Sequence, residues 1–463
     1  MLKILRDIIR DVVLIFTYTT FHPWKEETID AIMQTAPKKV INAWAMYDWA
    51  NSAYSLVVVS ALYPSYFIAI APERVQLLGR SFDRSALASY MISFSFFVIA
   101  IISPILSSIA DYKGNKKSFM KFFCYLGAAA CISLTFMTKE TITFGIVSAI
   151  LGAIGFAGSI VFYNSYLPDI AAEEDQDRIS AKGFVLGYIG SVLLMVFCLT
   201  AIILNDNMHL GWGAWPVRLS FLAVGLWWAG FAQITFNRLP ASKASQQHPE
   251  HNIFINGFYE LKKVWYQFRH HPIIKRFLVS FFFYNMGVQT VMYLAPYFAS
   301  DELKMESSQL IITIVIIQLV AILGAVIFSR LSKITSNLFT LGVIIVIWVG
   351  ICLFAYFVQT AMQFYALAFC VGMVMGGIQS MSRSTYSKLL PPTKDTASYF
   401  SFYDVCDKIG LVLGTLTFGY VGEFLGGMRN SVMTLMIFFI IGGILLLFVN
   451  RLQTRVRKPS VAI

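Results

Sequence analysis

The sequence predicts an all-α membrane protein with twelve transmembrane helices in two six-helix bundles. Of its 463 residues, 57% are hydrophobic and only 13% are charged, whereas soluble domains carry about 25% charged residues. A helix needs about 20 apolar residues to cross a bilayer, and segments of this kind recur along the whole chain. They are too long for the alternating strands of a membrane barrel.

The twelve helices follow one another with short connections, except for one long polar stretch between the sixth and the seventh. We expect them at residues 42–70, 86–109, 118–137, 141–167, 179–204, 215–236, 274–299, 308–329, 338–358, 362–386, 398–424 and 431–450. The predicted domains are therefore an N-terminal extension (1–40), a first bundle (41–236), a linker (237–273), a second bundle (274–450) and a basic tail (451–463).

Two segments outside the bundles have their own patterns. In the extension, Val12–Phe21 is too short to span and no small-residue cleavage site follows, so we expect a cytoplasmic or interfacial helix, with Met33 as an alternative start. In the linker, aromatic residues such as Trp265 and Phe268 recur at helical spacing beside basic residues. That pattern predicts an amphipathic helix on the inner membrane surface.

The basic residues predict the orientation of the chain. Most of the 36 Lys and Arg residues fall on one side when both termini are placed in the cytoplasm, and cytoplasmic loops are enriched in these residues. The net charge of +11 therefore indicates topology and contact with anionic lipid, and we expect no nucleic-acid partner. A multi-pass protein of the cell membrane is expected, in the bacterial inner membrane.

The six cysteines lie in apolar segments without metal-ligand spacing, and they are expected to be packing residues. Four of the six histidines lie in the polar linker. We therefore expect no metal site and no cofactor.

The two halves of the chain echo each other. YNSYLPD (163–169) closes the fourth segment and YSKLLPP (386–392) closes the tenth, and each then leads through a charged loop into a helix that contains glycines. Two related six-helix halves are the architecture of secondary transporters that rock around a site at the membrane midplane.

The loop after the second segment, SSIADYKGNKK (107–117), resembles the corresponding loop of the major facilitator superfamily, in which Gly-x-Leu-Ala-Asp-Arg-x-Gly-Arg-Lys is usual. Asp111, Gly114 and the two lysines that follow keep the pattern, whereas Ser107 and Tyr112 depart from it. A carboxylate here can stabilise the N-terminus of a neighbouring helix, and the glycine permits a tight turn.

Three further stretches resemble the vacuole-effluxer-like branch of this superfamily. They are WAMYDWANSAYS (44–55), FYNSYLPDIAAEEDQDRISAKGFVLGYIG (162–190), and GGIQSMSRSTYSKLLPP (376–392) with FSFYDVCDKIG (400–410). That branch includes fungal vacuolar amino-acid effluxers of autophagy and bacterial permeases. The resemblance covers residues 42–450 and implies a transporter with the major facilitator fold, and by relation an amino-acid exporter.

Two features of other superfamily members are missing. The fourth segment contains no arginine for proton coupling, and the fifth contains Gly183 and Gly187 but lacks the proline of drug/proton antiporters. Both absences argue against a multidrug antiporter, and small residues at this spacing are typical of helix packing.

The first segment carries a polar stripe. Asp48, Asn51, Ser52 and Ser55 fall at positions i, i+3, i+4 and i+7 of one helix, with Tyr47 and Tyr54 beside them. Such a stripe is unfavourable against lipid, so it is expected to point into the bundle. Alternatively, Asp48 is an interfacial residue, since it lies only nine positions after Lys39.

The seventh segment offers a counterpart in Asn285 and Gln289, at positions i and i+4. The superfamily resemblance implies that the first and seventh helices face one cavity. Gln379 and Arg383 of the tenth segment either line that cavity or cap a helix. In the eleventh segment Asp404, Asp407 and Lys408 share a face, and Lys408 pairs with Asp404 or extends to the inner surface.

We assign gating to a set of charged residues and one glycine. These are Asp111, Gly114, Lys117, Asp169, Arg178, Arg383, Asp407 and Lys408. Asp111 is expected beside the N-terminus of the eleventh helix, near Ser398–Ser401, and Asp169 or Arg178 is expected to pair with nearby loop charges.

The pattern favours a secondary active transporter, not an enzyme. We expect a monomer that exports a small polar solute, an amino acid by relation, by alternating access with coupling to protons. Asp48 would titrate a proton or bind the ammonium group of the substrate. The alternatives are an exporter of drug-like amphipathic compounds and a non-transporting membrane sensor. The chain contains no P-loop, which argues against an ATP-driven pump.

Overall fold

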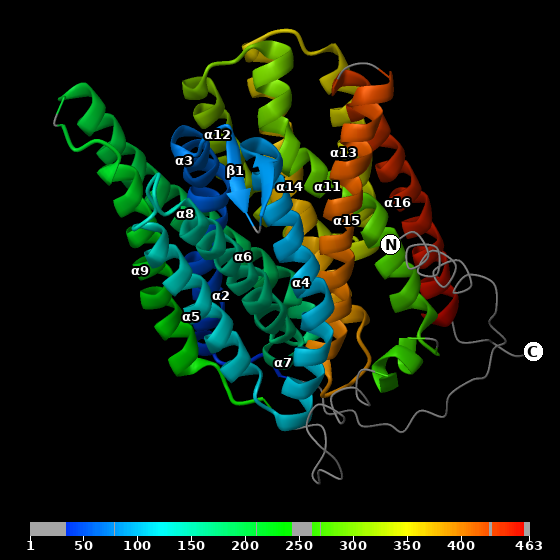
Figure 1. Ribbon diagram of the computed structural model, residues 1–463. Coiled ribbons are helices and arrows are strands. Elements are labelled where there is room, and N and C mark those ends of the chain that lie inside the picture. The colour runs from blue at the N-terminus through cyan, green and yellow to red at the C-terminus, as the bar shows by residue number, and fades with distance from the viewer. Residues whose placement is uncertain are drawn as a thin grey trace, which may run out of the picture. The chain divides into compact units, whose positions relative to one another are not determined.

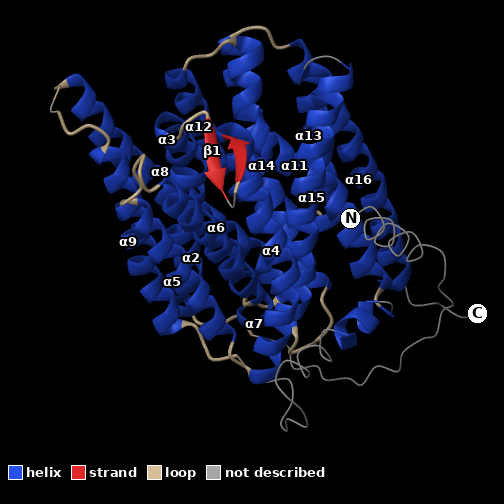
Figure 2. Cartoon of the chain, viewed as in Figure 1, coloured by secondary structure: helices blue, strands red, loops and turns tan. Residues whose placement is uncertain are grey.

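The computed structural model describes residues 34–457, apart from 78, 210, 243–261, 269 and 426–427. Within these residues, 12 helices are long and apolar enough to cross a membrane, which confirms the predicted fold class (Figures 1 and 2). The extension expected before residue 34 lies outside the described residues, as do the first aromatic residues of the linker pattern.

The first six spans contain most of the departures from simple helices. Their elements are α2 (Lys38–Ala53), the π-helix η1 (Tyr54–Leu62), α3 (Tyr63–Ile70), β1 (Arg74–Leu77), β2 (Arg80–Asp83), α4 (Arg84–Lys113), α5 (Lys116–Leu134), α6 (Ile142–Ser165), α7 (Leu167–Ile170), the 3₁₀ turn η2 (Glu173–Asp175), α8 (Gln176–Asn207) and α9 (Trp215–Arg238). The first span is therefore one continuous helical rod made of α2, η1 and α3.

The second six spans are regular helices throughout. They are α11 (Pro272–Leu303), α12 (Ser307–Ile334), α13 (Asn337–Phe357), α14 (Ala361–Leu389), α15 (Thr396–Leu425) and α16 (Met428–Arg457). Local sequence explains several of their ends. Ser336 caps α13 by accepting a hydrogen bond from the Phe339 N–H, and Thr360 forms a capping box with Gln363 at the start of α14, which satisfies backbone donors that lack helical partners.

A small antiparallel hairpin, β1–β2, connects the first and second spans and was not predicted. Its register pairs Arg74 with Asp83 and Leu77 with Arg80, and Gly79 takes a positive φ of 75° in the turn. Figure 2 shows the hairpin as the red element among blue helices. We call this end of the bundles the hairpin end.

The opposite end is where α4 ends and α5 begins, between Lys113 and Lys116. Gly114 has a φ of 65° there, which confirms its predicted role in a tight turn. We call this the basic end. In Figure 1, α4 runs from the hairpin toward the end at which α7 lies.

The bundles have separate hydrophobic cores. Trp44 and Trp228 are buried in the first core, and Tyr284 and Trp348 are buried in the second. Across the boundary α4 packs against α15, and α8 packs against α12 and α14; α4 and the orange α15 lie alongside each other in Figure 1. Polar residues on these boundary helices are therefore placed to join the two bundles.

The linker is described only near its end, where residues 262–268 are helical. Val264 and Phe268 are buried there. The Phe268 ring packs against Tyr399 and Phe402 of α15, with both centroid distances 5.0 Å. The described part of the expected surface helix therefore packs on the start of α15.

Candidate functional site

Arg383 of α14 extends from the second bundle into a polar socket formed by the first. Its Nε–H donates to Ser180 Oγ at 2.9 Å, and its Nη2 donates to the Ser180 carbonyl oxygen at 2.7 Å. Its Nη1 donates to Asn164 Oδ1 at 3.2 Å and pairs with Asp48 Oδ2 at 3.3 Å. The Tyr163 hydroxyl donates to the same Asp48 oxygen at 2.7 Å. One arginine thus joins α14 to α2, α6 and α8.

Aromatic rings enclose the guanidinium group of Arg383. Its Cζ lies 4.2 Å from the ring centroid of Phe184, 4.9 Å from that of Trp44 and 5.5 Å from that of Tyr163. Arg383 is only 3% exposed. Cation–π contacts strengthen when the cation is desolvated, to about 2 kcal/mol, so the rings stabilise the charge together with Asp48.

Gly183 of α8 leaves the space that this ion pair fills. A Cβ at this position would lie 2.4 Å from Asp48 Oδ2, 2.9 Å from Arg383 Nη2 and 2.9 Å from the Tyr163 hydroxyl. The sequence assigned Gly183 to helix packing, and the structure shows that it also makes room for a charged pair.

The polar stripe of α2 points toward α8 and α14 rather than lipid. Asp48 and Asn51 are buried, and Ser52 and Ser55 are partly buried. The Ser52 side chain lies against Gly187, where a Cβ would come within 2.5 Å of Ser52 Oγ. Asp48 lies ten residues into α2, which is about 15 Å from the basic end at 1.5 Å per residue. Asp48 is buried between helices, and its partner Arg383 lies six residues before the end of α14 at the basic end.

Tyr47 and Tyr54, which we expected at the site, belong to the core of the first bundle. Tyr47 packs against Tyr163 and Phe236, and Tyr54 packs against Phe156 and Trp228. Their helical positions turn them away from the stripe, so the rings stabilise the bundle instead of lining the boundary.

A second charged cluster lies in the other bundle and includes the expected α11 residues. Asn285 Nδ2 and Gln289 Nε2 donate to Asp407 Oδ1 at 2.8 and 2.7 Å. Lys408 Nζ pairs with Asp407 Oδ2 at 2.6 Å and with Asp404 Oδ1 at 3.2 Å. Lys408 lies twelve residues into α15, about 18 Å from the basic end. The cluster therefore lies away from the contacts at the basic end, and the gating role of Asp407 and Lys408 stays a prediction.

Two contacts connect this second cluster with its surroundings at the bundle boundary. The Lys408 ammonium lies 5.5 Å from the ring centroid of Phe96 in α4. Tyr403 is within electrostatic range of both Arg383 and Asp407.

Gln379, expected at the site, accepts a hydrogen bond from the hydroxyl of Tyr188 in α8 at 2.7 Å.

Asp111 lies at the N-terminus of α15, as the sequence predicted. Its carboxylate accepts hydrogen bonds from the Ala397 N–H at 3.2 Å and from the N–H and hydroxyl of Ser398, both at 2.7 Å. A carboxylate is stabilised at a helix N-terminus by the unpaired N–H groups and the helix dipole. Asp111 therefore joins α4 of the first bundle to α15 of the second.

Lys116 supports this contact, although the sequence did not assign it to the gate. Its Nζ lies 2.9 Å from Asp169 Oδ2 and 3.6 Å from Asp111 Oδ1, and it also donates to Thr396 Oγ1. Thr396 in turn donates to Asp169 Oδ1 at 3.3 Å. Asp169 thus pairs with a loop charge, as expected.

Asp177 forms a second connection at the basic end, and the sequence did not single it out. It accepts hydrogen bonds from Ser332 at 2.8 Å, Asn337 at 2.6 Å and Lys388 at 2.7 Å. These partners come from α12, α13 and α14. The only sequence signal was the acidic run before α8, which is also typical of an ordinary helix start.

Lys117 and Arg178 require correction. Lys117 donates to the carbonyl oxygens of Phe236 and Leu239 at the end of α9. Arg178 is 68% exposed and pairs with Asp175 at 2.8 Å. These contacts stay within the first bundle, so they do not connect the two bundles in this state.

The hydrogen bonds and ion pairs between the bundles given above lie between the basic end and the level of Tyr188 and Gln379. The structure therefore represents a state that is held closed at the basic end.

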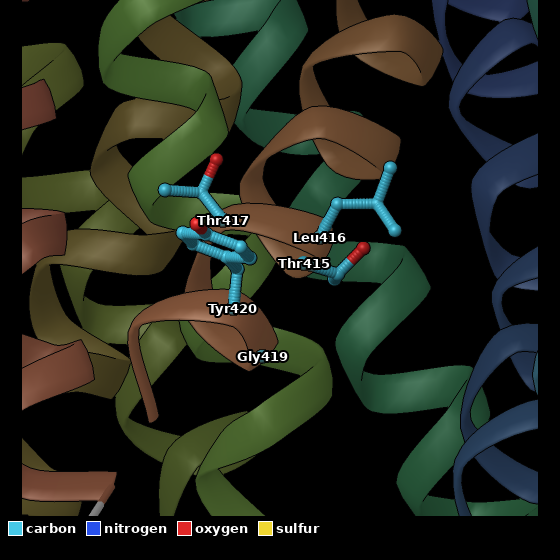
Figure 3. A pocket seen from close by; sticks show the side chains of 5 residues that line it. All are labelled: Thr415, Leu416, Thr417, Gly419 and Tyr420. Carbon is cyan, nitrogen blue, oxygen red and sulfur yellow. The ribbon is translucent and has the colours of Figure 1, made fainter. Parts of the chain in front are cut away.

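Two hollows lie away from the charged groups. One, of about 610 Å³, lies beside α15 and is lined by Thr415, Leu416, Thr417, Gly419 and Tyr420. These residues belong to a single helix (Figure 3), so a ligand there would have only one wall. The other, of about 60 Å³, is enclosed by mostly apolar side chains of the second bundle. Neither is lined by the ion pairs.

Fold and site together define a membrane transporter of the major facilitator superfamily. Twelve spans form two bundles, a buried ion pair joins the bundles, and polar contacts close one end. The chain belongs to the family described as vacuole effluxer Atg22 like, whose sequence model matches residues 36–458.

Relatives support this assignment. The chain is 34% identical to the uncharacterized MFS-type transporter YxiO of Bacillus subtilis (strain 168), over 88% of this chain and 94% of that protein. It is 24% identical to autophagy-related protein 22-1 of Aspergillus terreus, over 84% and 78%.

Solved structures show the same fold at low sequence identity. The human organic anion transporter MFSD10 matches with a TM-score of 0.68 at 13% identity, covering 88% of this chain and 99% of its own. The E. coli fucose:proton symporter FucP matches with a TM-score of 0.65 at 15% identity, covering 89% and 97%. At such identities the likeness concerns the fold alone.

Proposed function

We propose that the protein exports α-amino acids from the cytoplasm by alternating access, and that Asp48 and Arg383 bind the two charges of the substrate. The observation that carries this proposal is the buried pair between these residues, which joins the two bundles at 3.3 Å. An amino acid carries an ammonium and a carboxylate, the same two charges as the pair.

Opening of the basic end separates this pair, because Asp48 moves with the first bundle and Arg383 with the second. Leaving a buried charge without its partner costs about 3–5 kcal/mol. A zwitterion between the bundles offsets this cost, since its ammonium replaces Arg383 beside Asp48 and its carboxylate replaces Asp48 beside Arg383. A neutral sugar or a simple amine does not satisfy both charges.

The basic residues support the orientation of the chain, and the outward direction of transport is part of the proposal. Lys113, Lys116 and Lys117 gather at the closed end, and cytoplasmic loops are the ones enriched in Lys and Arg. With this end in the cytoplasm, its opening loads substrate from the cytoplasm, and its closure re-forms the Asp48–Arg383 pair and expels the substrate toward the hairpin end. The family description, vacuole effluxer Atg22 like, supports a solute transporter; it does not support the direction, because efflux from a vacuole delivers solute to the cytoplasm.

Thermal stability of the purified protein tests the proposal with matched ligands. A panel of amino acids is compared with amines that lack the carboxylate and acids that lack the ammonium, for example leucine, isoamylamine and 4-methylpentanoate. An amino acid at 100 times its Kd should stabilise the folded protein by about 2.7 kcal/mol. Asp48→Asn should weaken its binding at least about 30-fold, because a buried charge partner is worth about 2–5 kcal/mol.

The double variant Asp48→Asn/Arg383→Gln removes both charges and keeps the boundary neutral, so it should fold and still fail to bind. Asp175→Asn is the control, because this carboxylate pairs with Arg178 within the first bundle. Equal stabilisation by leucine and by either analogue, or full binding by the double variant, would show that the pair does not recognise a zwitterion.

A further inference from the structure

We propose that the protein couples transport to a proton bound by Asp404, in the cluster with Asp407 and Lys408. This inference rests on the transport function proposed above and assigns its coupling ion to a second site. The Asp48–Arg383 pair then serves the substrate, and the α15 cluster serves the driving ion.

The cluster contains more negative than positive charge. Lys408 contacts two carboxylates, Asp404 at 3.2 Å and Asp407 at 2.6 Å, and the three side chains are 10%, 6% and 17% exposed. Two carboxylates against one ammonium leave one negative charge at mid-depth in the membrane, where unbalanced charge is costly. The Asp48–Arg383 pair, by contrast, is balanced. The cluster is therefore suited to take up one positive charge.

The hydrogen bonds of the cluster indicate which carboxylate takes up the positive charge. Asp407 receives hydrogen bonds from Asn285, Gln289 and Lys408, and donors to a carboxylate favour its ionised form. Asp404 contacts only Lys408, through Oδ1, and its buried Oδ2 has no hydrogen-bond partner among the described residues. Asp404 Oδ2 is thus the oxygen that is available to a proton.

The elements packed around the cluster supply no further cation in the described structure. Tyr293 of α11 interacts electrostatically with Lys408 and Asp407, Cys406 and Tyr403 of α15 are the other titratable neighbours, and α4 presents the Phe96 ring. The α6 segment contains no Lys, Arg or His, and the basic residues of α4, α11 and α16 lie near helix ends. These are Arg84, Lys113, Lys275, Arg276, Arg429, Arg451, Arg455 and Arg457.

Arg383 of α14 is a further cation, and it interacts electrostatically with Tyr403 of α15. Its hydrogen bonds are made to the first bundle. When the basic end opens, Arg383 loses these hydrogen bonds to the first bundle. The electrostatic field at the cluster then changes, and this change links proton release from Asp404 to substrate loading.

The proton step is a simple transfer. A hydronium ion gives its proton to Asp404 Oδ2, water leaves, and the cluster becomes neutral with Lys408 paired to Asp407. One proton that moves inward against one zwitterion that moves outward transfers one net positive charge inward per cycle. Transport should therefore respond to membrane potential as well as to pH.

The test uses the full chain in proteoliposomes and compares two transport modes. In the wild type, a pH gradient should drive amino-acid accumulation, and labelled amino acid should also exchange against unlabelled amino acid without a gradient. Asp404→Asn mimics the protonated carboxyl group. It should lose at least tenfold in gradient-driven accumulation and keep exchange and amino-acid binding within about twofold. Asp404→Glu restores a titratable carboxyl group and should restore gradient-driven transport with a shifted pH profile.

The outcomes separate this inference from the proposed function. Absence of amino-acid exchange in the wild type would overturn the proposed function itself. Exchange with normal gradient-driven accumulation in Asp404→Asn would overturn the proton site alone. Loss of amino-acid binding in a folded Asp404→Asn variant would show that the cluster binds the substrate ammonium, and accumulation driven by a sodium gradient but not by pH would show a metal cation; either result overturns the proposal. Asp175→Asn, outside the cluster, should behave as the wild type.

Discussion

Gly183 shows how much of the site depends on one small residue. The ion pair between Asp48 and Arg383 occupies the space where any other residue at position 183 would place its Cβ. A hydrogen atom at this position allows α2, α8 and α14 to approach around the pair. The glycine therefore acts on charge as well as on packing.

We predict that Gly183→Ala weakens the Asp48–Arg383 pair and opens the basic end more often. The added methyl group would lie 2.4 Å from Asp48 Oδ2, so the carboxylate must move. The reporter is Ser384→Cys, at a buried position on α14, in a chain whose six cysteines are replaced. Its reaction with a water-soluble maleimide should accelerate.

Gly230→Ala is the matched control, because a Cβ there meets no atom within 4 Å. It should leave the maleimide reaction rate unchanged. A rate in Gly183→Ala equal to that of the control would mean that the pair does not hold the basic end closed.

The sequence singled out both partners of the pair and missed that they pair with each other. Helical spacing placed Asp48 on a polar stripe, since all members of a stripe lie on one helix. Arg383 lies 335 positions away in the other bundle, and periodicity within a helix carries no information about that neighbour. The same limit applies to Tyr47 and Tyr54, whose positions beside the stripe did not reveal that the bundle core covers them.

At the scale of elements, the N-terminus of α15 is capped by a side chain from another helix. Asp111 of α4 accepts two backbone N–H groups and a hydroxyl at this terminus. Hydrogen bonds to charged groups contribute about 1.5–3 kcal/mol each. The terminus therefore loses its cap whenever α4 and α15 separate at the basic end.

We predict that Asp111→Asn shifts the protein toward the state that is open at the basic end. The amide keeps the shape of the carboxylate and loses its charge. A loss of about 1.4 kcal/mol in the closed state raises the open population about tenfold. The Ser384→Cys reaction should accelerate by this factor, whereas Asp175→Asn, which removes a carboxylate at the same end, should not change it. An unchanged rate in Asp111→Asn would rule out the gating role of Asp111.

The long helices could be predicted because each is a continuous apolar segment of sufficient length, and all twelve are present. The hairpin was missed because its strands have four residues each, too few for a periodic signal. The π-helix at Tyr54–Leu62 was missed because hydrophobic spacing does not distinguish it from an α-helix. It contains Ser55, the last residue of the polar stripe, and π segments often occur at functional sites.

At the scale of the whole molecule, Asp111 and Asp177 close the same end on two sides of the boundary. Asp111 joins α4 to α15, and Asp177 joins α8 to α12, α13 and α14. They share no partners, so their contributions to the closed state should add as free energies. The sequence similarity between the two halves of the chain indicated two bundles. It did not show which end of the bundles is closed, because closure depends on contacts between distant loops.

We predict that Asp177→Asn alone accelerates the reaction of Ser384→Cys with the maleimide. In the double variant with Asp111→Asn, the two accelerations should multiply. Both substitutions act on one equilibrium between two states. Reaction rates in the two single variants and the double variant, measured at equal protein concentration, provide the check. A double variant no faster than the faster single variant would show that the two contacts do not act on one equilibrium.

The socket around Arg383 also bears on how tightly the membrane is sealed between transport cycles. Water and hydrated ions that leak along the bundle boundary must pass this level, where three rings surround the guanidinium group and its nitrogens are bonded to protein oxygens. The resting transporter would therefore preserve the ion gradient on which the cell depends, at the same point where we propose that it binds its cargo.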